Sequence, residues 1–373
     1  MCNAKFWLHK ARPNKMKIIL LGDASSIHIQ RWANSLCVNG DIVFVVSAHN
    51  FINGYHSKIK KIKLSYSAPI GYILSVYQLT KIVNGINPDV VNSHYATGYG
   101  FLSSFIRRFP VILSVWGSDV YLFPTKSLLH KLFIKFNLSK CTSIASTSKD
   151  MAGVVRKLVK GNKEIYITPF GIDVNFFQKK DDLIKEKITV GTTKGFDYTY
   201  GTDILIQAFA DILIKYPNLN IKLLLTGSGD MKQYVNLAKS LRIDGRVEFK
   251  GHVAHRNIVH YINEIDIYIA FSRSESFGVS VLEASSCEIP VITSDSGGLP
   301  EVVQNGETGY IVNLLDTANF ADRIYELITD REKRASMGRK GRRFVTENYL
   351  WNDSILKMKK AYSDTIKDFP SNK

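Results

Sequence analysis

Two glutamates, Glu275 and Glu283, are the strongest candidates for chemistry in this sequence. Glu275 follows an apolar run at 266–271, and Phe277 and Gly278 come directly after it, where a helix is expected to begin. Glycine lets a phosphate approach the backbone, and the free N–H groups at a helix start suit a diphosphate. Glu283 falls about one and a half turns into that helix, where a carboxylate can bind ribose hydroxyls. The pattern predicts a nucleotide diphosphate site, although both acids are also compatible with solvated loop and helix positions.

The elements that position these residues alternate between short β-rich runs and amphipathic stretches, which is typical of a parallel sheet with helices on both faces. The alternation restarts near the middle of the chain, and most runs are apolar almost throughout, as in strands covered on both faces. Helices are expected at 27–38 and 71–83. Strands are expected at 17–21, 41–47, 89–94, 111–116, 142–147, 187–192, 221–227, 246–251, 266–271 and 289–294.

The restart predicts an α/β fold of two Rossmann-like, doubly wound parallel-sheet domains that face each other across a cleft. Ligands of such sheets bind outside the carboxyl ends of the strands. We expect an N-terminal domain, a charged linker and a C-terminal domain, flanked by a leader or extension and by a C-terminal helix that packs back on the N-terminal domain. In chain order these five parts are 1–15, 16–170, 171–186, 187–348 and 349–373.

Composition narrows the class of protein. The 373 residues are 45% hydrophobic and 22% charged, which is normal for a globular chain, and no apolar run reaches the roughly 18 to 20 residues that span a bilayer. Residues 1–15 are basic but lack the apolar core of a secretory signal. The four cysteines form no C-x-x-C pair, which favours a reduced, cytoplasmic chain. The net charge of +16 favours a polyanionic partner or reflects a basic background.

The segment 275–303 resembles the Glu-x7-Glu region of the family 4 retaining glycosyltransferases, which have the GT-B fold. The resemblance covers essentially residues 16–365. Four further segments resemble parts of this family in the same order along the chain. They correspond to the acceptor-side loops of polysaccharide-building members, the connection from the first domain to the second, the helix after the donor-phosphate loop, and the glycine turn that follows. These segments are 88–100 followed by 111–120, then 168–177, 200–209 and 225–230.

What this resemblance implies is a retaining, metal-independent hexosyltransferase. Its donor would be a nucleotide-diphosphate sugar, with UDP the family's commonest carrier, and it would need no other cofactor. The acceptor would be a saccharide or lipid-linked saccharide in the synthesis of cell-surface polysaccharide or lipopolysaccharide. The diphosphate would leave, and its oxygen would help deprotonate an acceptor hydroxyl that attacks the same face of the sugar. A cytoplasmic enzyme, with peripheral contact at the inner face of the membrane, is the corresponding location.

The resemblance also assigns roles in the second domain. Glu275 would contact the sugar near the reacting centre, and Lys194 would neutralise the leaving diphosphate, which is usually the largest catalytic effect. Glu283 would bind ribose. The remaining donor-binding candidates are the backbone at Phe277, Gly278 and Val279 and the glycine turn at Gly227. Lys194 is also compatible with an ordinary surface lysine, and the glycine turn is a weak motif.

Three departures from the family pattern add candidates. Thr199 stands where relatives often have a second lysine, so Lys194 acts alone or shares its role with Arg273. The glycine-rich loop after the first strand is replaced by a segment whose Ser25, Ser26 and His28 are in place to reach the donor. Trp116 stands where many relatives have histidine, which leaves His94 and Asp119 as catalytic candidates on the acceptor side. The alternatives are a structural histidine and a turn aspartate that accepts backbone N–H groups.

A basic amphipathic stretch at 126–140 combines leucine and phenylalanine with lysine. Such a helix can lie on an anionic membrane, or it can bury its apolar side in the core and expose its lysines; the sequence favours neither.

Two other functions fit parts of the sequence. A nucleotide-sugar epimerase or hydrolase would use the same scaffold but would need residues placed for proton abstraction or water activation. A nucleic-acid-binding protein is suggested by the charge alone, and the sequence shows no recognition motif for it.

Overall fold

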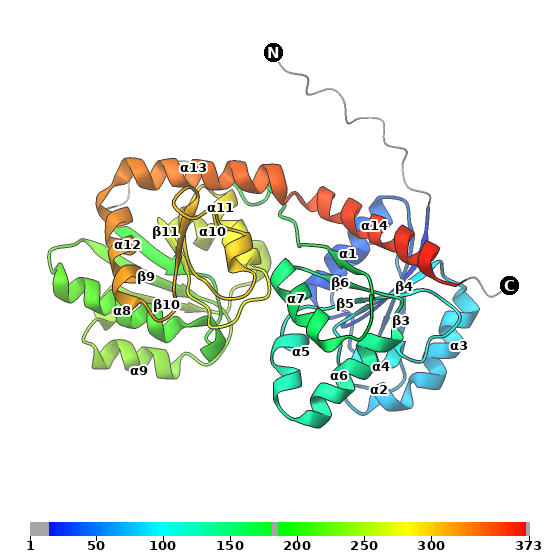
Figure 1. Cartoon of the computed structure of the whole chain (residues 1–373). Coiled ribbons are helices and arrows are strands. Elements are labelled where there is room, and N and C mark those ends of the chain that lie inside the picture. The colour runs from blue at the N-terminus through cyan, green and yellow to red at the C-terminus, as the bar shows by residue number, and fades with distance from the viewer. Residues whose placement is uncertain (1–14, 181–185, 371–373) are drawn as a thin grey trace, which may run out of the picture. The chain divides into compact units, whose positions relative to one another are not determined.

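The computed structural model describes residues 15–180 and 186–370, which form two compact units (Figure 1). Unit 1 contains the chain up to Ser146, Ala152–Thr168 and the stretch from Ile355 onwards. Unit 2 contains Thr147–Met151 and Pro169–Ser354. The predicted leader lies outside the described residues except for Lys15, as does the 181–185 part of the predicted linker.

Unit 1 is built on a seven-stranded sheet in the order β3-β2-β1-β4-β5-β6-β7, and every neighbouring pair is parallel. Its strands are β1 (Lys17–Leu21), β2 (Ile42–Ser47), β3 (Lys60–Lys63), β4 (Val90–His94), β5 (Val111–Ser114), β6 (Ser143–Ser146) and β7 (Ile165–Ile167). Its helices are α1 (Ile27–Val38), α2 (Gly71–Leu74), α3 (Val76–Ile86), α4 (Gly98–Ser103), α5 (Ser118–Tyr121), η1 (Phe123–Thr125), α6 (Leu128–Lys140), most of α7 (Lys149–Leu158) and most of α14 (Trp351–Asp368).

Unit 2 repeats the design with a six-stranded parallel sheet in the order β10-β9-β8-β11-β12-β13. Its strands are β8 (Ile188–Thr192), β9 (Ile221–Thr226), β10 (Val247–Gly251), β11 (Ile267–Ala270), β12 (Val291–Ser294) and β13 (Gly309–Val312). Its helices are η2 (Tyr198–Tyr200), α8 (Thr202–Lys215), α9 (Lys232–Ser240), η3 (Asp244–Arg246), α10 (His255–Glu264), α11 (Val279–Ser286), η4 (Leu299–Glu301), α12 (Thr317–Thr329) and α13 (Arg331–Asn348).

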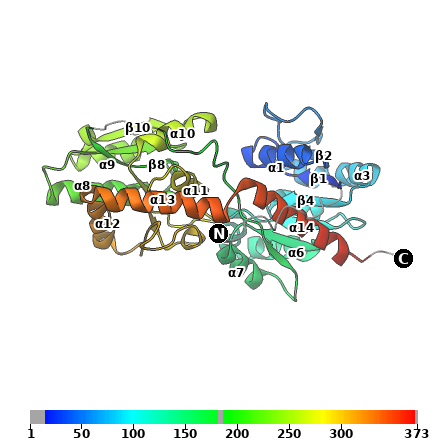
Figure 2. The same cartoon turned by 90° about the horizontal axis from the view of Figure 1, so that it is seen from above.

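The central strands of both sheets are buried on both faces, which explains their continuous apolar runs. In unit 2, α8 packs against α9 and α12 in one layer, and α11 packs against α10 and α13 in the other; helices cover both faces of each sheet (Figures 1 and 2). The first layer and the sheet enclose an apolar core, in which the rings of Phe271 and Phe320 stack with centroids 4.0 Å apart. Each unit is therefore a doubly wound α/β layer structure.

The C-terminal part of α14 is tied to unit 1 by buried polar contacts. Lys359 forms an ion pair with Asp41, with 2.8 Å between nitrogen and carboxylate oxygen, and both side chains are almost fully buried. The Tyr362 hydroxyl accepts a hydrogen bond of 2.7 Å from the side-chain amide of Asn92 on β4. Removing one partner from a buried ion pair costs about 3 to 5 kcal/mol, so these contacts hold this part of α14 on unit 1.

All ten expected strands are present, and the helix expected at 27–38 is α1. The single helix expected at 71–83 is wrong, because α2 ends at Leu74 and α3 begins at Val76. The backbone turns at Ser75, whose N–H donates to the carbonyl of Gly71. The sequence also did not predict β3, β7 and β13.

Candidate active site

The sheet order of unit 2 brings two predicted residues together. β8 and β11 are neighbours in the sheet, although β9 and β10 lie between them in the sequence, so the chain connections diverge between them. Ligands of open parallel sheets bind at such a switch point. Lys194 follows β8 and Glu275 follows β11, and the Lys194 ammonium forms an ion pair with the Glu275 carboxylate across this edge.

The ion pair is largely shielded from water, since the side chains of Lys194 and Glu275 are 8% and 13% exposed. Burial is the largest single influence on the pKa of the Lys194 ammonium and lowers it, but Glu275, Tyr268 and Tyr200 together outweigh burial, and the net pKa lies above its ordinary value. The ring of Tyr200 lies 5.2 Å from the Lys194 nitrogen. Lys194 is therefore a buried, charged residue and not an ordinary surface lysine.

The loop that carries Glu275 is held by the glycine turn after β12. The N–H of Gly298 donates to the carbonyl of Glu275 at 2.9 Å. Gly297 has a φ of +56°, and a Cβ placed on it would lie 2.0 Å from the same carbonyl oxygen. A side chain at Gly297 is excluded by both its conformation and the close approach. The two glycines thus hold the backbone of Glu275 against the turn that follows β12.

Helix α11 begins at Val279, with Gly278 as its N-cap residue at a φ of 107°. This confirms the expected helix start, and no side chain in the described part of the chain caps this end. The Phe277 side chain is buried against Tyr349, with ring centroids 5.7 Å apart. Phe277 therefore contributes its backbone alone. The uncapped backbone N–H groups from Phe277 to Val279 can donate hydrogen bonds to an anion.

Glu283 lies in α11 with its side chain only 8% exposed. Its carboxylate is 3.5 Å from the Nε2 atom of His255, the first residue of α10. The ring of Phe176 stacks on the His255 ring, with centroids 6.2 Å apart and planes 11° apart. Glu283 is thus an acid held in place by an imidazole and an aromatic ring, and not a solvated helix residue.

The other two candidates of unit 2 differ in their surroundings. Gly227 packs on the Lys194 loop, because a Cβ on it would lie 2.6 Å from the Lys194 carbonyl oxygen. Arg273 is already engaged, since its two terminal nitrogens donate to both oxygens of Asp203 at 2.8 and 2.6 Å. Its guanidinium also lies 3.8 Å from the centroid of the Tyr198 ring. The suggestion that Arg273 shares the phosphate charge with Lys194 finds no support in these contacts.

Unit 1 has its own switch point between β1 and β4, which are neighbours in its sheet. Ser25 and Ser26 follow β1. The hydroxyl of Ser25 donates to Asp23 at 2.6 Å, whereas the hydroxyl of Ser26 accepts from the N–H of His28 and caps α1. Ser25 is exposed and can still turn to a ligand, but the Ser26 hydroxyl already serves the helix.

His94 ends β4 on the other side of this switch point, and it is buried. Neither ring nitrogen has a hydrogen-bond partner among the described residues. Burial lowers the pKa of the imidazole to about 3, with a smaller contribution from His28. The ring of Trp116 contacts His94 edge to face at 5.3 Å and His28 at 5.6 Å. One nitrogen of a neutral imidazole can donate a hydrogen bond and the other can accept one, but both nitrogens of His94 are buried.

The contacts of Asp119 are those of a turn residue, which was the alternative role considered for it. Its carboxylate accepts backbone N–H groups from Ala96, Trp116 and Gly117 at 2.7, 3.1 and 2.8 Å. Burial raises the pKa of this carboxyl, and these three donors oppose the rise. Asp119 therefore shapes the loops after β4 and β5.

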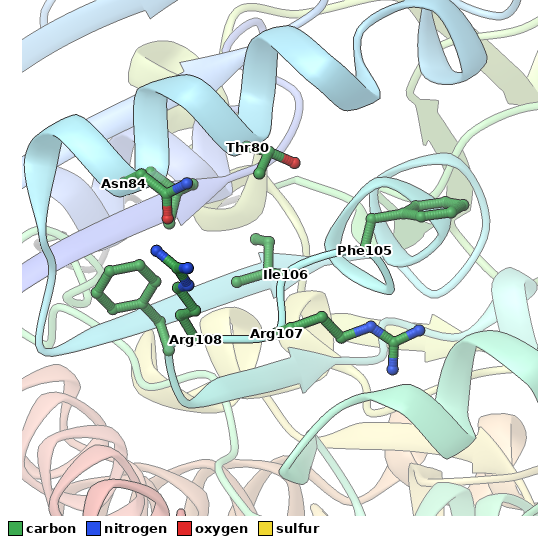
Figure 3. Close-up of a pocket in the computed structure, with 8 residues that line it drawn as sticks. Thr80, Asn84, Phe105, Ile106, Arg107 and Arg108 are labelled. Carbon is green, nitrogen blue, oxygen red and sulfur yellow. The ribbon is translucent and has the colours of Figure 1, made fainter. Parts of the chain in front are cut away.

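A cavity of about 290 Å³ lies elsewhere in unit 1, between α3 and the segment that follows α4 (Figure 3). None of the predicted site residues lines it. Its lining residues are Thr80, Val83, Asn84, Phe105, Ile106, Arg107, Arg108 and Phe109. Among the described residues, no group of three or more His, Cys, Asp or Glu side chains is arranged to hold a metal ion.

Three residues that the sequence analysis did not single out lie beside the candidate residues of unit 2. The buried hydroxyl of Tyr268, on β11, is 2.9 Å from the Thr193 hydroxyl, beside Lys194. Tyr200 faces the Lys194 ammonium, and His255 pairs with Glu283. The one signal available was that Tyr268 lies in the same predicted strand that leads to Glu275; the other two contacts depend on folding.

Two family models match the chain. One, described as glycosyl transferases group 1, matches residues 173–344, and one described as glycosyl transferase 4-like matches residues 17–148. A similar curated protein is the N-acetyl-alpha-D-glucosaminyl L-malate synthase of Bacillus anthracis. It is 28% identical over 78% of this chain and 78% of its own length.

Solved structures with the same fold cover nearly the whole chain. Sucrose-phosphate synthase from Thermosynechococcus elongatus aligns with a TM-score of 0.83 at 19% identity, over 94% of this chain and 99% of that one. HepE from Anabaena, in complex with UDP and glucose, aligns with a TM-score of 0.78 at 17% identity, over 93% of this chain and 99% of that one. The α/β class with two Rossmann-like domains of GT-B type is thereby confirmed.

Proposed function

The chain belongs to the glycosyl transferases group 1 family, and on that premise we propose that it transfers a hexose from a nucleotide-diphosphate sugar with retention of configuration. The proposed carrier nucleotide is UDP, which is bound by the structural relative HepE. The proposed acceptor is a hydroxyl group of a saccharide or lipid-linked saccharide in the synthesis of cell-surface polysaccharide or lipopolysaccharide.

One observation carries this proposal, namely the Lys194–Glu275 ion pair at the β8–β11 switch point. A buried lysine beside a carboxylate is a poor arrangement for stability alone, because desolvation offsets much of the attraction. It suits a site that must receive a negatively charged ligand. The uncapped start of α11, which follows Glu275, and the buried Glu283 supply the other groups that a nucleotide diphosphate needs.

The residues divide the reaction between them. The backbone amides from Phe277 to Val279 hold the diphosphate, and Lys194 stabilises the negative charge that grows on it as the bond to the sugar carbon breaks. Glu275 lies against the sugar near the reacting carbon, and Glu283 binds the ribose hydroxyls. The departing diphosphate oxygen takes the proton of the acceptor hydroxyl, and the acceptor oxygen bonds to the same face of the sugar.

The charge that this reaction requires is supplied by the protein. Lys194 provides a fixed cation, and the first turn of α11 provides the positive end of a helix dipole. We propose that the transfer proceeds without a metal ion or any cofactor other than the donor. We assign the acceptor side to unit 1, where the buried, neutral His94 imidazole has no hydrogen-bond partner for either nitrogen among the described residues.

The proposed location is the cytoplasm, with peripheral contact at the inner face of the membrane. No helix in the described parts of the chain is both long enough and apolar enough to cross a membrane.

A thermal-shift panel of nucleotide sugars tests the donor assignment. A donor at about 100 times its Kd adds about 2.7 kcal/mol of stability, which corresponds to a rise in Tm of about 5 to 10 °C for a unit of this size. Glu283→Ala should weaken donor binding by about 10- to 100-fold, because hydrogen bonds to a carboxylate are lost. Glu332→Ala, an exposed acid on α13, is the matched control and should change nothing.

Product analysis then separates transfer from the related reactions. A transferase releases the nucleotide diphosphate in proportion to glycosylated acceptor. Release of free sugar without an acceptor would instead identify a hydrolase, and an altered nucleotide sugar an epimerase. The proposal fails if no nucleotide sugar raises the Tm, or if Glu283→Ala and Glu332→Ala bind the donor equally well.

A further inference from the structure

Two polar side chains at the carboxyl edge of the unit 1 sheet have no role in the proposed mechanism. Asp23 follows β1 and His49 follows β2, and these strands are parallel neighbours, so both residues lie at the edge where β4 ends in His94. A Cβ on Gly22 would lie 3.3 Å from the Cβ of His94, which places the loop of Asp23 beside that histidine. The side chains of His49 and Asp23 are 33% and 40% exposed. Both can therefore meet a ligand at the edge where parallel sheets bind them.

A buried network of hydroxyl groups contacts the His49 ring. The Tyr99 hydroxyl is 2.6 Å from Nδ1 of His49 and 3.1 Å from the Ser47 hydroxyl, and it accepts the N–H of Ala48 at 3.1 Å. The Ser47 hydroxyl accepts the N–H groups of Ala24 and His49, both at 3.0 Å. Ser47 and Tyr99 are almost fully buried. Burial raises the pKa of Tyr99 to about 12, so its hydroxyl keeps its proton at neutral pH.

The numbers of donors and acceptors in this network assign its protons, because a hydroxyl group has two lone pairs and one hydrogen. Both lone pairs of Ser47 are taken by backbone N–H groups, so its hydrogen is donated to Tyr99. Tyr99 accepts from Ser47 and from Ala48, so its own hydrogen is donated to Nδ1 of His49. A neutral imidazole has one N–H group. The network therefore places the His49 proton on Nε2.

This arrangement leaves one donor and one acceptor without partners in the same place. The Nε2–H group of His49 has no hydrogen-bond partner in the described part of the chain. One carboxylate oxygen of Asp23 accepts the N–H and the hydroxyl of Ser25, at 2.8 and 2.6 Å. The other has no partner among residues 15–180 and 186–370. The engaged oxygen is 3.8 Å from Nδ1 of His49, so the two side chains are immediate neighbours.

A tyrosine ring adds an apolar face to this pair. The half-buried ring of Tyr72 lies 6.4 Å from the His49 ring and contacts Tyr99 edge to face at 5.2 Å, measured between centroids. Gly98 makes room for it, since a Cβ on that residue would lie 2.2 Å from the Tyr72 ring. A tyrosine held in this way supplies rigid contact area at little cost in entropy. We call Asp23, His49 and Tyr72 the His49 cluster.

We propose that the His49 cluster binds two adjacent hydroxyl groups on an uncharged sugar ring of the acceptor. One hydroxyl accepts from Nε2–H of His49, its neighbour donates to the free oxygen of Asp23, and the sugar ring lies against Tyr72. A phosphate or carboxylate fits less well, because it would face the negative charge of Asp23. The inference rests on the proposed function for the identity of the ligand as the acceptor. It adds that the acceptor sugar carries a vicinal diol and that the His49 cluster selects for it.

Binding of methyl glycosides to the full chain, without any donor, tests this inference. Saturation-transfer NMR titrations compare the methyl glycosides of glucose, galactose and mannose with their 3-deoxy counterparts, which have no two adjacent hydroxyl groups. The 3-deoxy compounds should bind about tenfold more weakly or worse, because a polar group of the site is left without its partner. Inorganic phosphate should not displace the parent glycosides.

Substitutions in the His49 cluster separate contact with the ligand from a structural role. His49→Phe should weaken glycoside binding by about 3- to 10-fold, and His49→Gln, whose amide retains an N–H donor, should recover part of the loss. Asp23→Ala should weaken it by about 10- to 100-fold, because the lost hydrogen bond is to a charged group. The matched control is His130→Phe, since His130 is also half-buried with Nδ1 2.7 Å from a hydroxyl, and it should bind glycosides as the wild type does. An unchanged Tm checks that each variant folds.

Tyr99→Phe tests the proton assignment with a readout that needs neither ligand nor activity. Nitrogen-15 NMR of histidine-labelled protein distinguishes protonated from unprotonated ring nitrogens, and His49→Phe identifies the signals of His49. The wild type should show a protonated Nε2 and an unprotonated Nδ1. Tyr99→Phe should show a mixture of both tautomers, because no hydroxyl then donates to Nδ1.

Several results would overturn the inference. These are equal binding of the parent and 3-deoxy glycosides, no binding of either, displacement by phosphate, equal affinities of His49→Phe and His130→Phe, or a wild-type His49 proton on Nδ1. Each of them leaves the thermal-shift test of the donor unaffected. Conversely, if no nucleotide sugar raises the Tm but glycosides bind through His49 and Asp23, the transfer proposal fails and the diol site remains.

Discussion

Substituting methionine for Lys194 tests the ion pair on which the proposed mechanism depends. Methionine keeps most of the length of the lysine stem but removes the ammonium. The Glu275 carboxylate then remains in a site where its side chain is only 13% exposed and has lost its partner. Two effects are expected, since the folded state loses the compensation of a buried charge and the reaction loses the cation that stabilises the leaving diphosphate.

The size of each effect follows from the burial of the pair. Removing one partner of a buried ion pair costs about 3 to 5 kcal/mol, and the residual exposure of Glu275 places Lys194→Met near the lower end, at about 3 kcal/mol. For a unit of this size, that corresponds to a fall in Tm of about 6 to 12 °C. Turnover should fall by about 100- to 1,000-fold, which is typical for the loss of one group that stabilises developing charge.

A second substitution distinguishes an orphaned charge from general damage to the core. In the double variant Lys194→Met with Glu275→Gln, no buried charge remains, so about 2 kcal/mol of the lost stability should return while turnover stays low. Lys222→Met is the matched control, because its ion pair with Glu248 has side chains that are 34% and 40% exposed. Its cost should be below about 1 kcal/mol.

Denaturant unfolding and initial-rate measurements test both effects. They compare the wild-type chain with Lys194→Met, with the double variant and with Lys222→Met. The pKa of Lys194 is raised above its ordinary value of 10.5 in the folded state. The stabilisation by the pair should therefore be fully present below about pH 10.5 and should be lost as the pH rises through the higher folded value. If Lys194→Met unfolds at the wild-type denaturant concentration and retains full turnover, the ion pair has neither role and the mechanism is refuted.

Three further predictions concern single positions. Glu275→Gln should lower kcat by about 100-fold and leave donor affinity within about threefold, as measured by initial rates and calorimetry, since the role of this acid lies near the reacting carbon; unchanged kcat would refute that role. Gly297→Ala should cost about 2 kcal/mol more than Gly306→Ala, because both have positive φ but only the first meets a backbone oxygen, that of Glu275; equal unfolding midpoints would contradict this. The pKa of His94 is lowered to about 3, so the wild-type chain should lose about 2 kcal/mol between pH 7 and pH 5 that His94→Gln does not lose; parallel pH profiles would show that His94 is not buried in its neutral form.

The fold could be predicted from the sequence where burial leaves a continuous apolar run. The central strands of both sheets have such runs, and all of them were found. The strands that were missed lie at the sheet edges. β3 is an edge strand with the sequence KKIK and exposed side chains, and β7 and β13 are edge strands of three and four residues. An edge strand is covered less, so it needs no long apolar run and leaves little pattern to detect.

The site could be predicted where it depends on local sequence, and not where it depends on strand order. The start of α11 between Glu275 and Glu283 was visible, because both acids and the glycine lie within one short segment. The contact between Lys194 and Glu275 joins residues 81 positions apart and follows from the pairing of β8 with β11. The ion pair of Arg273 could not be predicted for the same reason, since its partner Asp203 is 70 residues away on α8.

Each unit has a switch point, and the two switch points differ in their electrostatics, which supports the proposed division of roles. At the β8–β11 edge, Lys194 keeps its charge because Glu275 lies beside it, and the uncapped start of α11 adds a positive dipole. At the β1–β4 edge, His94 is neutral between Trp116 and the core, with no charge partner to retain a proton. A fixed cation suits a diphosphate whose charge grows during the reaction. A neutral imidazole nitrogen can accept a hydrogen bond from a hydroxyl group, whereas both nitrogens of an imidazolium can only donate. The physical properties of the two edges therefore match the two substrates that a sugar transfer must bring together.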